Sequence, residues 1–306
     1  MAKLVIRNSR IIDSRIIDSQ IIDSQIIDCH CHAGIGDRMT APWNTVAPIK
    51  TYLRRARAAG IDKTIVIPPF HGNYAEANDH LGRLVARYPD RLVGFAFVHA
   101  KRDAGRIFEM VGRALKKWRF RGIKVHGFDA MPTREVCEAA RKFRLPMLVD
   151  VVSRPEVVDM LAPQYPDVNF IIPHLGSFTD DWKAHQQVIY QIARYPNVYA
   201  DTSAVRQFDY LVQAIKLAGP RKLLFGSDGP WTHPGLELHK IRLLGLPPDQ
   251  RAKVLSGNVL RLLLRPPVGL AAEITRTERD MHHERSRSER VAPDHLPVVP
   301  ESEYHL

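Results

Sequence analysis

Long apolar segments are missing from this chain of 306 residues. It contains no run of about 18 apolar residues, which excludes a transmembrane helix of ordinary length. The N-terminus also lacks an apolar stretch followed by a small-residue cleavage site, so we expect neither a secretory signal nor a membrane partner. The 3 cysteines are too few for a disulfide scaffold, which agrees with the reducing cytoplasm as the expected location.

Recognition motifs for nucleic acid are also absent, although the formal net charge is +11. No C2H2 zinc-finger pattern, RNP motif or continuous basic arm accompanies that charge. The basic residues are scattered through segments with helical character, such as YLRRARAAG and ALKKWRFRG. We therefore expect a solvated basic surface that favours small anionic molecules, and no nucleic-acid partner.

A five-residue repeat is the first feature that is present. The unit IIDS(R/Q) recurs three times over residues 11–25, and a fourth copy changes to IIDCHCH at residues 26–32. A period of five matches neither a helix nor a strand, and four units make only about one coil of a β-helix. We interpret the copies as a tandem duplication, assign residues 1–25 to an N-terminal extension, and place the first strand at residues 26–32.

Eight short apolar segments, rich in Val, Ile and Phe, follow one another along the chain. Their nearly continuous apolar character is typical of parallel strands that are buried on both faces. Amphipathic stretches separate them, and several of these end in Gly or Tyr-Pro just before the next segment. The predicted strands cover residues 26–32, 63–69, 92–100, 122–127, 146–152, 169–176, 197–203 and 222–228.

This alternation predicts the fold class. Eight strands that alternate with helices over residues 26–264 indicate an α/β protein with a single (β/α)8 TIM-type barrel. A doubly wound open sheet is the alternative, but no G-x-G-x-x-G follows the first strand. Residues 265–306 are polar and proline-studded, so we expect a largely disordered tail in which the adjacent His282 and His283 are exposed to solvent.

Ionisable side chains gather at the C-terminal ends of the predicted strands. In a barrel these ends converge on one face, which is where active sites lie. A charge at the end of an apolar strand is costly unless it is paired or bound to a metal. The residues concerned are His30, His32, His99, His126, Asp150, His174 and Asp228.

Side-chain alternation along the first strand predicts which residues share a face. Asp28, His30 and His32 would point to one side, where the two imidazoles could bind a single cation. Cys29 and Cys31 would point to the other side, towards the helices, as small core side chains.

The motifs IIDCHCH, GIKVHG, NFIIPHLGSF, NVYADTS and LLFGSDGPW occur in an order that resembles the metal-dependent amidohydrolase superfamily. The branch that the chain resembles is the amidohydrolase-related (amidohydrolase 2) one, which includes aminocarboxymuconate-semialdehyde decarboxylase and resorcylate decarboxylases. The resemblance spans residues 26–264 and implies a distorted TIM barrel that holds one divalent ion. Zn2+ is the expected ion, with Mn2+ or Fe2+ as alternatives.

The resemblance also implies roles for individual residues. His30 and His32 would be metal ligands, and Asp228 would be both a ligand and the proton acceptor for the attacking water. His174 would orient that water or polarise the substrate. Asp228 and His174 are therefore the expected catalytic residues.

One position departs from the family pattern. The fifth strand of the family usually ends in a ligand His, whereas this sequence has Asp150 there. We favour Asp150 as a further ligand, which would make a harder site that tolerates Mn2+ or Fe2+ better. Alternatively, Asp150 binds substrate or the metal is held weakly, and His126 could supply the missing imidazole.

Lys124 raises the question of a second metal, because a carboxylated lysine on the fourth strand bridges two metals in some branches. Without the His on the fifth strand the second site would lack a ligand, so we expect a mononuclear centre. Strand alternation places Lys124 on the same inward face as His126. We interpret Lys124 as a contact for a substrate anion or as a residue that caps the core. His126 is a further candidate substrate contact, and His99 is a candidate wall of the pocket.

Three functions are compatible with these residues. The first is a metal-dependent hydrolase that acts on an amide, ester or lactone of a small, anionic organic compound. The alternative is a non-oxidative decarboxylase, a carbon–carbon lyase for an aromatic or unsaturated carboxylic acid, because it needs the same ligands. The third is a metal-poor binding protein on the same scaffold. We expect a small-molecule substrate in each enzymatic case and leave a homodimer open.

Overall fold

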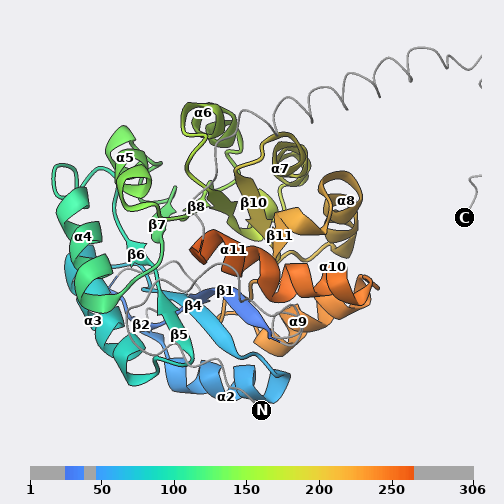
Figure 1. Cartoon of the computed structure of the whole chain (residues 1–306), viewed down its shortest axis with the longest axis horizontal. Helices are drawn as coiled ribbons and strands as arrows, with labels where there is room; N and C mark the ends of the chain where they lie inside the picture. The colour runs from blue at the N-terminus through green and yellow to red at the C-terminus, as the bar shows by residue number, and fades with distance from the viewer. Residues whose placement is uncertain (1–24, 38–45, 265–306) are drawn as a thin grey trace, which may run out of the picture. The chain divides into compact units, whose positions relative to one another are not determined.

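The computed structural model of the protein describes residues 25–37 and 46–264. Residues 1–24 and 265–306, to which the predicted extension and tail belong, lie outside this description. Within it, parallel strands alternate with helices, which confirms the α/β class (Figure 1). No helix in the described ranges is long and apolar enough to cross a membrane.

Nine short parallel strands form the framework of the fold over residues 25–37 and 46–264, and every predicted strand coincides with at least one of them. A two-stranded antiparallel ribbon, β2 (Gly34–Ile35) with β3 (Val46–Ala47), lies outside this framework. The parallel strands are β1 (Ile27–His32), β4 (Lys63–Ile67), β5 (Leu92–Gly94), β6 (Ala96–Phe97), β7 (Ile123–His126), β8 (Met147–Asp150), β9 (Phe170–Ile172), β10 (Val198–Asp201) and β11 (Leu223–Leu224).

The strands pair in two sheets that meet at both of their edges. One sheet has the order β1-β4-β5 and the other has the order β11-β10-β9-β8-β7-β6. Only Phe95 separates β5 from β6, and its backbone N–H donates to the Val66 carbonyl. At the other edge the Cys29 N–H donates to the Phe225 carbonyl at 2.9 Å, and Cys31 forms a parallel bridge with Gly229. These contacts close a TIM-barrel-like ring.

Helices surround this ring of strands in Figure 1. Local sequence explains several of their ends. Gly60 ends α2 (Ile49–Ala59) with a left-handed φ of 84°, and the Asp181 side chain accepts N–H groups at the start of α7 (Trp182–Arg194). The helices are α2 (Ile49–Ala59), α3 (Tyr74–Arg87), α4 (Ile107–Trp118), α5 (Arg134–Phe143), α6 (Glu156–Gln164), α7 (Trp182–Arg194), α8 (Phe208–Ala218), α9 (Pro234–Leu243), α10 (Pro248–Ala252) and α11 (Asn258–Leu264).

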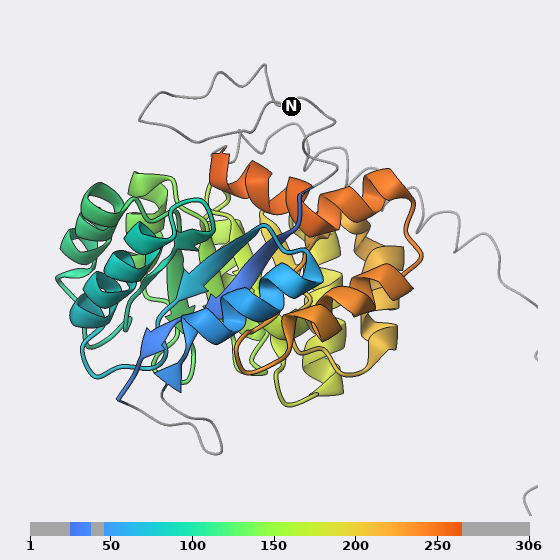
Figure 2. The same ribbon diagram turned by 90° about the horizontal axis from the view of Figure 1, so that it is seen from below.

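Two apolar clusters fill the space inside and outside the strands. The outer cluster packs the strands against the helices and includes Val66 and Val125. The inner cluster occupies the interior of the ring and includes Ile65 and Leu148, together with Leu262 of α11. Figure 1 shows α11 across the middle of the ring, and Figure 2 shows it at the end where β1 begins. The opposite end, where the strands finish, is left for a site.

All eight predicted strands are shorter in the structure than in the sequence-based assignment, and two of the predicted site residues have a left-handed backbone conformation. The segment predicted at 169–176 forms a strand only to Ile172 and continues as a 3-10 turn, η1 (Pro173–Gly176). His174 has φ 58° in this turn, a left-handed conformation that breaks the strand pattern. The segment predicted at 222–228 is a strand only at β11, and Asp228 again has a positive φ of 54°.

Candidate metal centre

A β-bulge in β1 changes the predicted orientation of its side chains. The pairing of β1 with β4 shifts register between Asp28 and Cys31. An extra residue at a bulge breaks the strict alternation of faces. The prediction that Asp28 shares the face of His30 and His32 was therefore wrong, because the Asp28 carboxylate contacts Tyr52 on α2.

The two cysteines of β1 are separated by the same bulge. Cys29 belongs to the inner cluster, whereas Cys31 belongs to the outer one. The prediction was right for Cys31 and wrong for Cys29. Both thiols are buried and free, and burial raises their pKa well above the usual value, so neither is an accessible thiolate.

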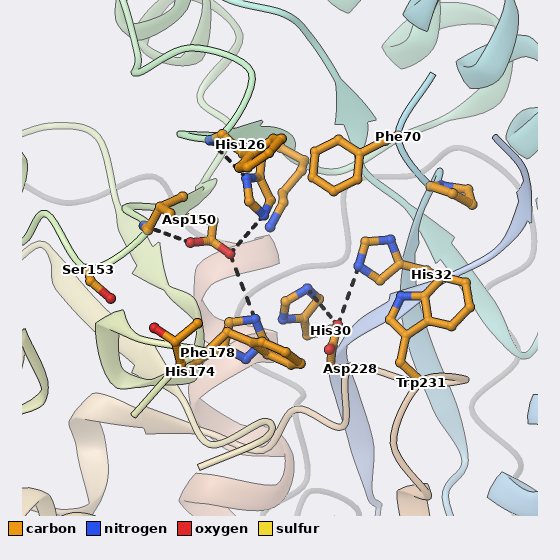
Figure 3. Close-up of a pocket in the computed structure, with 15 residues that line it drawn as sticks. His30, His32, Phe70, His126, Asp150, Ser153, His174, Phe178, Asp228 and Trp231 are labelled. Atoms are coloured by element: carbon orange, nitrogen blue, oxygen red, sulfur yellow. Dashed lines mark hydrogen bonds and ion pairs between the residues drawn. The ribbon is translucent and has the colours of Figure 1, made fainter. Parts of the chain in front are cut away.

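A pocket of about 290 Å³ opens at the C-terminal ends of the strands. All the predicted site residues except His99 line it, and Figure 3 shows how they converge from different strands. Four aromatic side chains that the sequence analysis did not select also form its walls. The lining residues are His30, His32, Pro69, Phe70, Lys124, His126, Phe128, Asp150, Val152, Ser153, His174, Phe178, Thr179, Asp228 and Trp231.

His30 is oriented by Asp201, at the end of β10. Its Nδ1 lies 2.9 Å from a carboxylate oxygen of Asp201. Burial would raise the pKa of Asp201, but its contact with His30 and a hydrogen bond from Ser203 lower that pKa to about 2. Burial also lowers the pKa of His30 to about 4, against the attraction of Asp201. His30 is therefore neutral near pH 7, with its proton on Nδ1 and a lone pair on Nε2.

His32 is held in the same tautomer by a backbone group. Its Nδ1 lies 3.2 Å from the carbonyl oxygen of Pro68, which can only accept a hydrogen bond, so Nδ1 carries the proton. The Nε2 lone pair of His32 then points to Asp228, whose Oδ1 is 3.4 Å away. The Nε2 of His30 lies 3.6 Å from the same oxygen.

These three side chains fit a divalent cation. Nε2 of His30 is buried and has no hydrogen-bond partner among the described residues, a state that costs about 1–3 kcal/mol for a buried polar atom. Two imidazole lone pairs that face one carboxylate oxygen repel each other unless a cation lies between them. His30, His32 and Asp228 offer ligand atoms within 4.8 Å of one another. Two neutral imidazoles with a carboxylate suit Zn2+, Mn2+ or Fe2+.

His174 presents a third imidazole to the pocket. Its Nδ1 lies 3.0 Å from the Ser203 carbonyl oxygen, which places the proton on Nδ1 and leaves the Nε2 lone pair towards the pocket. His30, His174 and Asp201 also lie within ligand distance of one another. The Asp201 oxygens and both Nδ1 atoms are already engaged in hydrogen bonds, so we interpret this second group as a support for the first.

Asp150 pairs with His126 rather than with the His30 group. Oδ2 of Asp150 lies 3.1 Å from Nε2 of His126 and 3.8 Å from Nε2 of His174, while Oδ1 accepts the Val152 N–H (Figure 3). Burial opposes ionisation, but His126 and the Lys124 amine hold the pKa of Asp150 well below its usual range. Ligation by Asp150 stays a prediction that its observed contacts do not favour.

His126 has no nitrogen free for a metal in this arrangement. Its Nδ1 accepts the backbone N–H of Phe128 at 3.1 Å, so Nε2 carries the proton that points to Asp150. If His126 bound a metal, which was the alternative predicted from the sequence, it would lose one of these two contacts. His126 does line the pocket, so its predicted role as a substrate contact stays a prediction.

Lys124 lies in the floor of the pocket with 1% of its surface exposed. Burial lowers the pKa of its amine, while Asp150, Asp201 and Asp228 oppose that effect. Within the described ranges, its Nζ forms no ion pair and no hydrogen bond. A buried ammonium group without a partner is costly, which makes Lys124 a candidate contact for an anionic ligand.

His99 lies away from this pocket. Its Nδ1 accepts the backbone N–H groups of Lys101 and Arg102 in the turn that follows β6. Its predicted role as a pocket wall finds no support in the described residues. Asp201 was missed by the sequence analysis, although it ends a predicted strand in the same way as Asp150 does.

The chain matches a known protein family. A family model described as amidohydrolase matches residues 27–265. No curated protein matches the chain.

Several solved structures are similar in fold. The 5-carboxyvanillate decarboxylase of Sphingomonas paucimobilis has a TM-score of 0.61 and 16% identity, covering 78% of this chain and 99% of that one. A probable 2-pyrone-4,6-dicarboxylic acid hydrolase from Acinetobacter baumannii, with citric acid bound, has a TM-score of 0.61 and 17% identity over 78% and 99%. A dihydroxybenzoic acid decarboxylase from Polaromonas sp. JS666, with bound manganese and 2-nitroresorcinol, has a TM-score of 0.57 and 17% identity over 78% and 97%.

Proposed function

This chain belongs to the amidohydrolase family, and from that premise we propose that it is a metal-dependent hydrolase of a small, anionic organic compound. An amide, an ester or a lactone is the bond class that we propose. The observation that carries the proposal is the convergence of the His30 and His32 Nε2 lone pairs on one oxygen of Asp228. No purely structural role explains two buried lone pairs directed at a carboxylate.

We propose Zn2+ as the resident ion, with Mn2+ as the first alternative because one similar structure contains manganese. When bound, such an ion polarises a substrate oxygen and lowers the pKa of water. His30 and His32 would hold it through Nε2, and Asp228 through Oδ1. Zinc accepts this mixed donor set readily, and Mn2+ prefers its carboxylate component.

The second oxygen of Asp228 is the proposed proton acceptor for the attacking water. His174 has its Nε2 lone pair directed into the pocket, so it can orient that water or accept a hydrogen bond from the substrate. Positioned groups of this kind typically contribute about 10²–10⁴-fold to a rate. The proposed roles therefore divide between proton transfer by Asp228 and orientation by His174.

The side chains that line the pocket favour a flat, anionic substrate. Phe70, Phe128, Phe178 and Trp231 surround the cavity with aromatic faces and edges, which favour a planar ring. The Lys124 amine in the floor offers a positive charge to a carboxylate. A cavity of about 290 Å³ suits a compound with one small ring.

Non-oxidative decarboxylation of an aromatic or unsaturated carboxylic acid is the second candidate. It is favoured by the decarboxylases among the similar structures. The same ligands would hold the ion and Lys124 would hold the carboxylate. His174 would take up a proton from solvent on Nε2 and pass it to the ring carbon as carbon dioxide leaves. The two reactions differ in the pocket contacts and not in the metal ligands.

One screen separates the two candidates. The protein is loaded with Zn2+ or Mn2+ and incubated separately with 2-pyrone-4,6-dicarboxylic acid, 2,6-dihydroxybenzoate and 5-carboxyvanillate. Opening of the pyrone ring without release of carbon dioxide would support the hydrolase, and carbon dioxide release would support the lyase. A protein that takes up neither ion, yet binds these acids and transforms none of them, would contradict both candidates and favour the metal-poor binding protein.

We also propose a cytoplasmic location. All 3 cysteines are free and buried, which agrees with a reducing environment. Reaction of the native protein with a thiol reagent, compared with the unfolded protein, would test whether these thiols remain reduced in cells.

A further inference from the structure

The carboxyl group of Asp28 lies directly behind the candidate metal centre, on the opposite face of β1. It is completely buried, and no Lys or Arg side chain in the described ranges pairs with it. A buried carboxylate without a cation must be stabilised by hydrogen-bond donors. For Asp28 these donors are two backbone N–H groups and two hydroxyl groups.

Two backbone N–H groups converge on one oxygen of Asp28. The N–H of His30 donates to Oδ1 at 3.1 Å, and the N–H of Ser227 donates to the same atom at 2.9 Å. The other oxygen, Oδ2, accepts the hydroxyl groups of Ser227 and Tyr52. All four donors belong to groups that are buried with Asp28.

These two N–H groups belong to the two segments that carry the proposed ligands. His30 lies on β1, and Ser227 immediately precedes Asp228, so the Asp28 carboxylate joins its own strand to a residue 199 positions away in sequence. The bulge in β1 leaves the His30 N–H without a partner in the ladder, and the Asp28 side chain accepts it. The next contact joins the same segments, because the Asp228 N–H donates to the His30 carbonyl at 2.7 Å.

We propose that Asp28 is a positioning residue of the metal centre, which sets the distance between His30 and Asp228 through their backbone. Asp28 is not itself a ligand, because its carboxylate faces Tyr52 and belongs to neither group of candidate ligands. This inference rests on the proposed metal-dependent function. Metal affinity depends strongly on groups that hold the ligands in place, typically by about 10- to 100-fold.

Two substitutions at the same position separate positioning from general stability. Asp28→Ala removes both contacts to the backbone N–H groups. Asp28→Asn keeps one carbonyl oxygen for those N–H groups, while its NH2 can face the two hydroxyls, which are able to accept. Should Asp28→Ala fail to fold, Asp28→Ser takes its place, because one short hydroxyl cannot span both N–H groups.

A buried polar residue away from the site provides the matched control. The Asn78 side chain makes two hydrogen bonds with the backbone of Phe97, at 2.8 Å and 2.9 Å, and lies outside the pocket lining. Asn78→Ala therefore removes two buried hydrogen bonds to the backbone, as Asp28→Ala does, without touching β1 or the segment before Asp228. It measures how far metal affinity follows stability alone.

The experiment measures the dissociation constants of Zn2+ and Co2+, the absorption spectrum of the Co2+ form and the melting temperature of each variant. We expect Asp28→Ala to weaken binding about tenfold or more and to alter the Co2+ spectrum, and Asp28→Asn to stay within about threefold of wild type. Asn78→Ala should melt at a lower temperature with unchanged affinity. The inference would be overturned if Asp28→Ala bound Zn2+ and Co2+ as tightly as the wild type, or if it lost no more affinity than Asn78→Ala. A wild-type chain that binds neither ion would overturn the proposed function itself.

Discussion

His30 and Asp201 lie 171 residues apart in sequence, yet Nδ1 of the one lies 2.9 Å from a carboxylate oxygen of the other in the buried interior of the barrel. This contact decides which nitrogen of His30 carries a proton. Because Asp201 is ionised, Nδ1 donates and Nε2 keeps the lone pair that a metal requires.

Asp201→Asn should therefore weaken metal binding without unfolding the protein. Oδ1 of Asp201 accepts the backbone N–H groups of His174 and Ser203, which cannot become acceptors. An Asn must keep its oxygen there and turn its NH2 towards His30. His30 would then accept at Nδ1 and carry its proton on Nε2, where it no longer binds a metal.

The expected loss in metal affinity is about 10- to 100-fold, measured by competition with a chromogenic chelator. Asp209→Asn, an exposed substitution at the start of α8, is the matched control and should bind metal as the wild type does. Equal affinity in Asp201→Asn and Asp209→Asn would show that Asp201 does not control the His30 tautomer.

The positions of most site residues could be predicted from the sequence because one pattern repeats. His30, His126, His174 and Asp228 each follow an apolar segment, and parallel strands bring such positions to one end of a barrel. Asp201 follows the same pattern and could have been found in the same way. The role of Asp201 could not be predicted, because it depends on a contact with His30 of β1, which is far away in sequence.

The orientation of Asp28 and Cys29 could not be predicted, because simple alternation assumes an unbroken ladder. The bulge arises from the pairing of β1 with β4 and from the contacts with the segment around Ser227, and neither is visible in a local pattern. His99 fits the local pattern but lies after a strand that stops at Phe97, so it stabilises a turn instead.

Lys124→Met should abolish the preference for anionic ligands while leaving the fold intact. The amine is buried and has no ion pair within the described ranges, so its removal relieves a desolvation cost and replaces it with an apolar side chain of similar length. We expect an unchanged or higher melting temperature. Quenching of Trp231 fluorescence in the pocket reports binding.

Two ligands of similar shape make this test specific. Binding of 2,6-dihydroxybenzoate should weaken about tenfold or more in Lys124→Met, as expected for the loss of a charge-assisted hydrogen bond. Binding of 2-nitroresorcinol, which lacks the carboxylate, should change much less. A parallel loss for both ligands would mean that Lys124 shapes the pocket rather than recognises the anion.

His185, which is not one of the proposed metal ligands, provides a pH-dependent contribution to the free energy of unfolding. Its ring is buried on α7, Nδ1 lies 3.1 Å from the Leu175 carbonyl oxygen, and Nε2 lies 3.9 Å from a carboxylate oxygen of Asp180. Burial lowers the pKa of His185 below 6.5, against the attraction of Asp180 and Asp181. Below that pH the unfolded chain binds more protons than the folded one, so acid favours unfolding.

His185→Asn keeps a donor near the Leu175 carbonyl and removes the titrating group. We expect the wild type to lose more free energy of unfolding than His185→Asn when the pH falls from 7 to 5, as measured by urea denaturation. Parallel pH profiles of the two proteins would show that His185 titrates equally in both states and that burial does not control it.

The proposed function requires one divalent ion bound by His30, His32 and Asp228. Asp228→Asn keeps the size of the side chain but removes its charge and its ability to accept a proton, and the melting temperature should change little. The direct measurement is the metal content of the purified wild type and Asp228→Asn proteins after equilibration with limiting Zn2+, with turnover of the transformed substrate recorded in parallel. We predict about one ion per wild-type chain, a clear reduction in Asp228→Asn, and turnover lower by about 10²-fold or more. Equal metal content and equal turnover in the two proteins would contradict the assignment.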